Sequence, residues 1–136
     1  MGHPIFIFVE DPGAANYVAP VLASLRRADW APLLLAVQPA LSYLEDRGVA
    51  VSALSPERPL GDILESIRPE ALVIGTSENP DTPGLSLVAV ARHLGIPSIG
   101  VVDGPANADF RFRGRGNSAF DFAPDWLFLP DSWTAE

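Results

Sequence analysis

The feature that most constrains the fold is a set of short apolar runs, each followed by a stretch in which apolar residues recur at helical spacing. In the first run, every residue from Ile5 to Val9 is apolar. A continuous apolar run predicts a strand with both faces buried, as in a parallel sheet covered by helices on each side. The alternation of such runs with helical stretches predicts an α/β fold, a three-layer, Rossmann-like, doubly wound parallel sheet of about six strands in the order 3-2-1-4-5-6.

These patterns also place the individual elements. We expect strands at Pro4–Val9, Leu33–Val37, Val49–Leu54, Ala71–Ile74, Ser98–Val102 and Trp126–Leu129. We expect helices at Ala15–Ala28, Ala40–Arg47, Pro59–Ile67 and Leu85–Leu94. Gly48 and Gly95 follow the second and fourth of these helices, and glycine is common just after a helix end. The third strand is expected to lie near an edge of the sheet.

Composition and charge narrow the classes of function. The chain has 136 residues, no cysteine and a formal net charge of −8, and its basic residues are all arginines. The length fits one domain, which we take to span residues 1–136. Without cysteine or lysine, disulfides, thiolate nucleophiles and Schiff-base chemistry are excluded. The acidic charge argues against nucleic acid as a partner.

The sequence contains no segment that indicates a membrane. No apolar run approaches the roughly 18 residues that a membrane span requires. No basic region precedes an apolar stretch at the N-terminus, as it does in a signal peptide. We therefore expect a cytoplasmic protein without a membrane span.

Polar residues gather after three of the expected strands, at the edge where their carboxyl ends meet. In an open α/β sheet, ligands bind at this edge, where the strand order reverses. The three polar segments are Glu10–Asn16, Gly75–Asn79 and Asp103–Asn107, and the last runs on to Arg111 and Arg113. Arginine suits a phosphate or carboxylate because its planar fork donates two parallel hydrogen bonds. We expect substrate-binding roles for Asp11, Gly13, Asn16, Thr76, Ser77, Asn79, Asn107, Arg111 and Arg113.

Each of these segments also has a purely structural interpretation. Pro12-Gly13 forms a good turn in any loop. Gly75–Asn79 could be a polar connection between a strand and a helix, and the arginines could pair with neighbouring acids in a solvated loop.

The sequence argues against several common kinds of active site. His3 and His93 are predicted to lie at the opposite edge of the sheet, so a Ser-His-Asp triad is not expected. The turn after the first strand lacks the G-x-G-x-x-G pattern of dinucleotide-binding proteins, and no P-loop is present. The carboxylates have no diagnostic metal-ligand spacing. We therefore expect no metal and no cofactor.

Three motifs together resemble a known family. They are Gly75-Thr76-Ser77-Glu78-Asn79, the stretch Ala91-Arg92-His93-Leu94-Gly95-Ile96-Pro97-Ser98-Ile99, and Asp103 to Arg113. They resemble the N-terminal domain of two-domain GT-B-type glycosyltransferases, and in particular the non-hydrolysing UDP-N-acetylglucosamine 2-epimerases. The resemblance spans Ile5 to Trp133. It implies that the chain is the N-terminal half of a larger protein acting in polysaccharide or glycoconjugate biosynthesis.

The resemblance also implies roles for individual residues. Glu78 and Asp103 match the acids that these epimerases place over the sugar, so they would be the catalytic residues. Asp11 or Asn16 would lie where the first loop touches the substrate, and Arg111 or Arg113 would match the arginine that follows the second acid. The implied partners are a sugar nucleotide and an acceptor sugar, bound with a C-terminal domain, and a homo-oligomer is compatible with this picture.

Two other hypotheses remain open at this point. The chain could be a stand-alone module that binds a nucleotide or a small anion through its arginine segment. It could also be a structural or interaction domain that uses the long segment after Asp103 and its C-terminal tryptophans as an interface.

Overall fold

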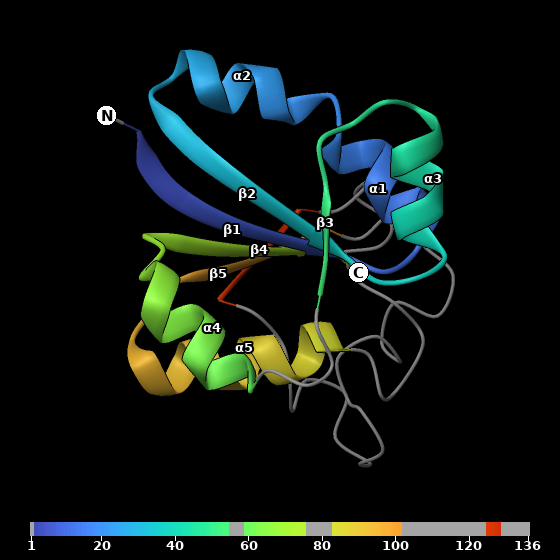
Figure 1. The fold of residues 1–136 in the computed structure, drawn as a ribbon. Coiled ribbons are helices and arrows are strands. Elements are labelled where there is room, and N and C mark those ends of the chain that lie inside the picture. The colour runs from blue at the N-terminus through green and yellow to red at the C-terminus, as the bar shows by residue number, and fades with distance from the viewer. Residues whose placement is uncertain (1, 55–58, 76–82, 102–124, 129–136) are drawn as a thin grey trace.

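The computed structural model describes residues 2–54, 59–75, 83–101 and 125–128 (Figure 1). Its strands are β1 (His3–Val9), β2 (Trp30–Ala36), β3 (Ser52–Ala53), β4 (Ala71–Gly75), β5 (Ser98–Val101) and β6 (Trp126–Phe128). Its helices are α1 (Pro12–Val18), α2 (Val21–Arg27), α3 (Ala40–Asp46), α4 (Leu60–Ile67) and α5 (Pro83–Leu94). None of these described helices is long and apolar enough to cross a membrane.

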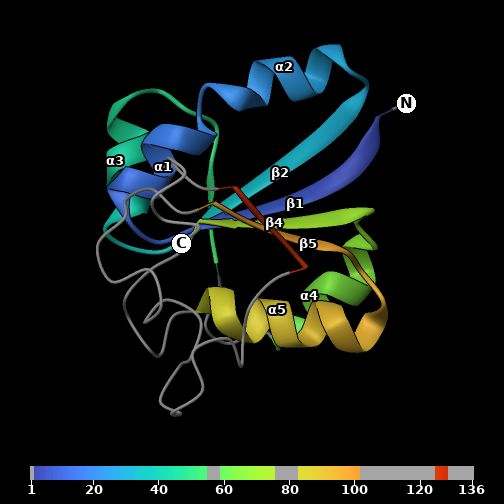
Figure 2. The same ribbon diagram turned by 180° about the vertical axis from the view of Figure 1, so that it is seen from behind.

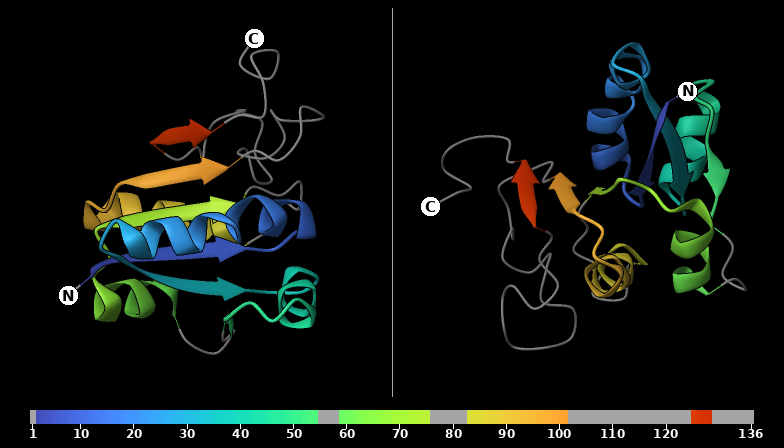
Figure 3. Two further views of the ribbon diagram at one scale, coloured as in Figure 1. Left: turned by 90° about the horizontal axis from the view of Figure 1, so that it is seen from above. Right: turned by 90° about the vertical axis from the view of Figure 1, so that its left-hand side faces the viewer.

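The strands form one parallel sheet. Neighbouring strands follow the order β3-β2-β1-β4-β5, as predicted, and the short strand β6 pairs with β5. All the strand arrows point the same way in the left panel of Figure 3. Seen from behind, β5 and the red β6 lie on the near side of the sheet (Figure 2). The fold class predicted from the apolar runs is confirmed.

Two hydrophobic cores lie on the two faces of this sheet. One core packs Ile5, Ile7 and Val9 against α1, α2 and α3. The other packs Phe6 and Phe8 against α4 and α5. Successive residues of a strand point to opposite faces, so one apolar strand supplies both cores. In Figure 1, α2 lies above the sheet, and α4 and α5 lie below it.

The single helix predicted over Ala15–Ala28 is wrong, because the structure has two helices there. α1 already begins at Pro12, with Asp11 as its N-cap residue, and it ends at Val18. α2 begins after Pro20. Proline has no N–H to continue the helix, and its ring clashes with the carbonyl four residues earlier, so position 20 ends α1. The same residue type is favoured in the first turn of a helix, which explains the early start at Pro12.

The third strand is shorter than the predicted Val49–Leu54. Only Ser52 and Ala53 pair with β2, opposite Leu35 and Ala36, and both lie exposed at the edge of the sheet. The apolar residues around them contribute to the cores: Val49 and Val51 are partly buried against one core, and Leu54 is buried in the other. The N–H of Leu54 also donates to the oxygen of Ala36 in β2, at 3.0 Å. The predicted edge position is confirmed.

The two helix ends predicted from Gly48 and Gly95 are confirmed. Gly48 and Gly95 have φ angles of 71° and 74°, which glycine adopts without steric cost. After Gly48, the N–H of Val49 donates to the oxygen of Leu44, at 3.1 Å. After Gly95, Ile96 donates to Ala91 in the same way, at 2.8 Å. These six-to-one hydrogen bonds define the Schellman motif, which reverses the chain at the end of a helix.

The difference in burial between β4 and β2 leads to a prediction about the stability of the fold. Leu72 of β4 is completely buried, whereas Leu33 of β2 is 37% exposed. We expect Leu72→Ala to lower the free energy of unfolding by about 2–5 kcal/mol, because it leaves a cavity in a close-packed core. Leu33→Ala removes the same atoms from a partly solvated position, so it should cost less than half as much. Urea unfolding of the two variants measures the difference, and equal losses would contradict the assignment of Leu72 to the core.

Candidate functional site

The strand order reverses between β1 and β4. From β1 the chain passes outward to β2 and β3 through α1, α2 and α3, and it then returns through α4 to β4 on the other side of β1. The connections on the two sides of this point lie on opposite faces of the sheet. The carboxyl ends of β1 and β4 therefore form the edge at which open α/β sheets bind their ligands. The sequence predicted this location.

A buried acid lies at this point. Glu10 directly follows β1 and is only 7% exposed, and among the described polar side chains only Ser98 is buried to a similar degree. The backbone holds the surrounding turn in place. The N–H of Ala40 donates to the oxygen of Glu10 at 2.8 Å, and the N–H of Val37 donates to the oxygen of Val9 at 3.3 Å. The start of α3 is thereby tied to the end of β1.

A glycine brings α1 against the end of β4. Gly75 is the last residue of β4, and a Cβ atom built on it would overlap the Cβ of Ala14 and lie 3.1 Å from Val9 Cγ1. The close approach of α1 to β4 therefore depends on having no side chain at this position. Gly75 and Ala14 together fix how closely the first turns of α1 approach the edge between the two strands.

A polar link joins α1 to α3 beside this edge. The hydroxyl of Tyr43 donates to Asn16 Oδ1 at 3.3 Å. The guanidinium of Arg47 lies 3.6 Å from the centre of the Tyr43 ring, and its Nη1 donates to the Tyr43 carbonyl oxygen at 3.2 Å. A cation over an aromatic face is attracted by the ring's negative charge distribution. The link holds the Asn16 side chain between two helices at the rim of the candidate site.

The structure places three of the predicted binding residues at this edge. Asp11 is the N-cap of α1 without a side-chain capping bond, and Gly13 and Asn16 are exposed residues of that helix. They lie on a helix and not in the loop that the Pro12-Gly13 turn suggested. The other predicted site residues lie outside the described residues; they are Thr76, Ser77, Glu78, Asn79, Asp103, Asn107, Arg111 and Arg113.

Both histidines lie at the opposite edge, as predicted. His3 begins β1, and its Nδ1 is 2.9 Å from Glu70 Oε1. Its ring also faces Trp30, with 5.7 Å between the ring centroids. His93 lies in the last turn of α5, which runs back from the carboxyl edge. In the described ranges of the chain, no group of three His, Asp or Glu side chains could hold a metal ion.

Glu10 opens the first polar segment predicted at this edge, but it was not among the residues expected to bind substrate or to act in catalysis. It is the first polar residue after an unbroken apolar strand, and this position puts a side chain at the carboxyl edge. The position alone could therefore have marked Glu10, although only the structure shows that it is buried.

The contact between Gly75 and Ala14 is testable. We expect Gly75→Ala to lower the free energy of unfolding by about 1–3 kcal/mol, because the added methyl group overpacks a tight contact. Gly61→Ala is the matched control, since Gly61 lies in α4 with only Val90 Cγ1 within 4.0 Å. That change should be neutral or stabilising, because alanine favours a helix over glycine. Thermal unfolding of both variants gives the comparison, and adding Ala14→Gly to Gly75→Ala should restore stability if α1 is the obstacle.

Comparisons with known proteins show which structures share this fold. Protein-family models and curated protein sequences give no match to the chain. Solved structures do match. A UDP-N-acetylglucosamine 2-epimerase superposes with a TM-score of 0.70 at 13% identity, covering 98% of this chain and 43% of its own.

Two further structures match to a similar degree. A Listeria monocytogenes protein proposed to be a UDP-N-acetylglucosamine 2-epimerase has a TM-score of 0.70 at 10% identity, covering 98% of this chain and 40% of its own. The Staphylococcus aureus MnaA–UDP complex has a TM-score of 0.68 at 16% identity, covering 99% of this chain and 39% of its own. The chain spans less than half the length of each neighbour. Over nearly its whole length, it therefore has the fold of one part of these larger, GT-B-like proteins.

Proposed function

We propose that this chain is the N-terminal, acceptor-side domain of a GT-B-like enzyme that acts on a sugar nucleotide in polysaccharide or glycoconjugate biosynthesis. The observation that carries the proposal is the superposition of 98–99% of the chain on proteins that include UDP-N-acetylglucosamine 2-epimerases and a complex with UDP. The proposed ligand is a sugar nucleotide, held between this domain and a second, C-terminal domain. We also propose that the protein is cytoplasmic and that it forms a homo-oligomer.

The geometry of the sheet supports a shared role for the two predicted catalytic acids. The ends of β4 and β5 are adjacent, since Gly75 pairs with Val101. Glu78 and Asp103 follow these two strand ends closely in the sequence, after Gly75 and Val101 respectively. This nearness in sequence to two adjacent strand ends is what supports a shared role for the acids.

In this proposal the domain supplies proton transfer and orientation. Glu78 and Asp103 act as general base and general acid toward the sugar ring or an acceptor hydroxyl, a role that carboxylates perform when they are positioned next to the reacting proton. Arg111 and Arg113 hold a phosphate or carboxylate. The second domain stabilises the charge that develops on the leaving phosphate.

The function is tested by incubating the complete protein with UDP-N-acetylglucosamine, with and without acceptor sugars, and following the products by NMR. Conversion to the C2 epimer without an acceptor identifies an epimerase. Release of UDP that depends on an acceptor identifies a transferase. Failure to bind any sugar nucleotide, measured by calorimetry on the folded protein, would overturn the proposal.

Removing the two acids should separate chemistry from folding. We expect Glu78→Ala and Asp103→Ala each to reduce kcat by about 100-fold or more in the complete protein, the usual contribution of a general acid or base. The unfolding midpoint of both variants should stay close to that of the parent. His93→Ala is the control, because His93 lies at the opposite edge, and its kcat should be unchanged. Loss of folding in both acid variants would assign these residues a structural role.

Asn16 gives a test of substrate contact at the described edge. We expect Asn16→Ala to raise KM roughly 3- to 10-fold, the contribution of one hydrogen bond. Tyr43→Phe removes only the hydroxyl that donates to Asn16, so it should raise KM less. Steady-state kinetics with the sugar nucleotide checks both variants. If the two changes have equal effects on KM and on stability, Asn16 acts only as a brace between α1 and α3.

A further inference from the structure

The side chain of Asn16 is held through its hydrogen-bond acceptor. The hydroxyl of Tyr43 donates to Asn16 Oδ1 at 3.3 Å. An asparagine amide also carries two N–H donors, both on Nδ2. Within the described ranges of the chain, no hydrogen bond uses these two N–H groups, and Asn16 lies exposed on α1. The amide is thus fixed by its oxygen, and its donors can serve a partner from outside these ranges.

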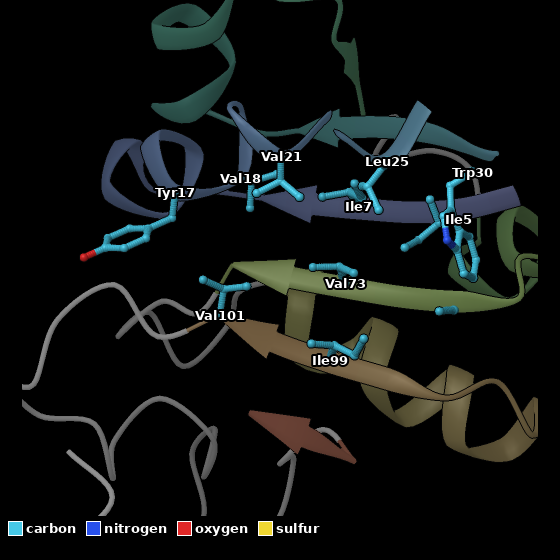
Figure 4. Close-up of a pocket in the computed structure, with 11 residues that line it drawn as sticks. Ile5, Ile7, Tyr17, Val18, Val21, Leu25, Trp30, Val73, Ile99 and Val101 are labelled. Atoms are coloured by element: carbon cyan, nitrogen blue, oxygen red, sulfur yellow. The ribbon is translucent and has the colours of Figure 1, made fainter. Parts of the chain in front are cut away.

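The second turn of α1 carries Asn16 at the carboxyl end of the sheet. The ring of Tyr17, the next residue, lies toward the carboxyl ends of β1 and β4 (Figure 4). Asn16 itself is turned toward α3, the helix to which Tyr43 belongs. The Asn16 amide therefore lies in the part of α1 that borders the candidate site.

Tyr43 holds this amide from a fixed position. Its half-buried ring packs against the core that is shared by α1, α2 and α3. The start of α3 is tied to the end of β1, because the N–H of Ala40 donates to the oxygen of Glu10 at 2.8 Å. The guanidinium of Arg47 lies 3.6 Å from the centre of the ring, and its Nη1 donates to the Tyr43 carbonyl oxygen at 3.2 Å. These contacts leave the hydroxyl little freedom to turn away from Asn16.

The charge of Arg47 also favours the direction of this hydrogen bond. A cation over an aromatic ring attracts the electron density of the ring. In a phenol, this attraction makes the O–H group a stronger donor and the oxygen a weaker acceptor. Tyr43 is therefore suited to donate to Asn16 Oδ1 and poorly suited to accept from Nδ2. Its donation decides which end of the amide points toward α3 and which end points away.

We propose that Tyr43 is a positioning residue, which turns the Asn16 amide so that Nδ2 donates to an oxygen of the ligand that carries no proton. The inference rests on the proposed function, in which the ligand at this edge is a sugar nucleotide. With its oxygen turned toward Tyr43, the amide gives hydrogen bonds to the ligand and does not receive them. A sugar nucleotide offers two oxygens of this class, those of its phosphates and the carbonyl of an N-acetyl group.

The direction of the hydrogen bond is tested without a ligand. Asn16→Asp keeps an oxygen in the position of Oδ1 and removes both N–H donors. We expect Tyr43→Phe to lower the thermal unfolding midpoint of the complete protein by roughly 1–3 °C, and by at least as much in the Asn16→Asp background, because a donated bond survives there. Loss of the Tyr43→Phe effect in that background would overturn the inference, since the hydroxyl must then accept from Nδ2.

Calorimetry on the complete protein tests the contact with the ligand, with UDP-N-acetylglucosamine and UDP as probes. We expect Asn16→Asp to weaken binding about tenfold or more, because a carboxylate cannot donate and repels an acceptor oxygen. Gln38→Glu is the matched control. It changes an exposed amide to a carboxylate just after β2 and keeps the oxygen that accepts from the N–H of Ser42. Its affinity should stay within about twofold of the parent, because an exposed charge is screened.

The two probes also identify the oxygen that Asn16 contacts. Weaker binding of both UDP and UDP-N-acetylglucosamine identifies a phosphate oxygen, whereas weaker binding of UDP-N-acetylglucosamine alone identifies the N-acetyl carbonyl. In an Asn16→Ala background, Tyr43→Phe should cause no further loss of affinity, because Tyr43 acts through Asn16. A further loss would contradict the positioning role.

The outcomes separate this inference from the proposed function. If the parent binds the probes and Asn16→Asp binds them equally well, Asn16 is only a brace between α1 and α3, and the inference alone fails. An equal loss of affinity in Asn16→Asp and Gln38→Glu would also overturn it, because added negative charge would then be the cause. If the parent binds neither probe, the proposed function fails, and the contact inferred for Asn16 fails with it.

Discussion

The pairing of β1 with both β2 and β4 is the interaction on which the rest of the structure depends. β1 pairs with β2 over seven residues and with β4 over four. Its alternate side chains enter opposite cores, with Ile7 completely buried on one face and Phe6 and Phe8 on the other. A strand buried in this way fixes the register of its neighbours, because a shift of one residue would exchange the two faces. Both helical layers therefore pack against residues of β1, and the strand order reverses beside it.

β1 also determines which residues form the candidate site. The site begins where β1 stops, so its first groups are the buried Glu10 and the N-cap Asp11. Gly75 lets α1 approach the end of β4, and the backbone bond from Ala40 to Glu10 holds α3 to the same point. Three segments that are far apart in the sequence thus meet through backbone contacts and small residues. Polar side chains such as that of Asn16 are then left at the rim.

Much of this arrangement could be predicted from the sequence. Short apolar runs such as Ile5–Val9 are typical of buried strands. Their alternation with helical stretches, together with right-handed crossovers, favours the strand order that the structure has. Gly48 and Gly95 marked two helix ends because a left-handed residue is needed there. The interpretation of Ala15–Ala28 failed because apolar periodicity continues across Pro20, although proline cannot continue the hydrogen-bond ladder.

The packing contacts at the site were harder to predict from the sequence. The close approach of Gly75 to Ala14 depends on how α1 packs across the sheet, and no local pattern encodes that. The hydrogen bond from Tyr43 to Asn16 joins residues 27 positions apart. The turn after β2 is hydrogen-bonded to the backbone of Val9 and Glu10, which is again a tertiary contact. Position along the chain predicts which residues lie at the carboxyl edge, and packing decides how their side chains are held there.

The division of one crossover into two helices at Pro20 has a consequence for how this protein can change over time. α1 and its N-cap place Asp11, Gly13 and Asn16 at the carboxyl edge of the sheet, while Val21 and Leu25 of α2 line an apolar groove on one face of the sheet. In an unbroken helix, rotating one end to suit a new neighbour would rotate the other end by the same angle. The break allows the two halves to diverge separately, so the contacts of α2 can be remodelled while the residues at the carboxyl edge keep their arrangement.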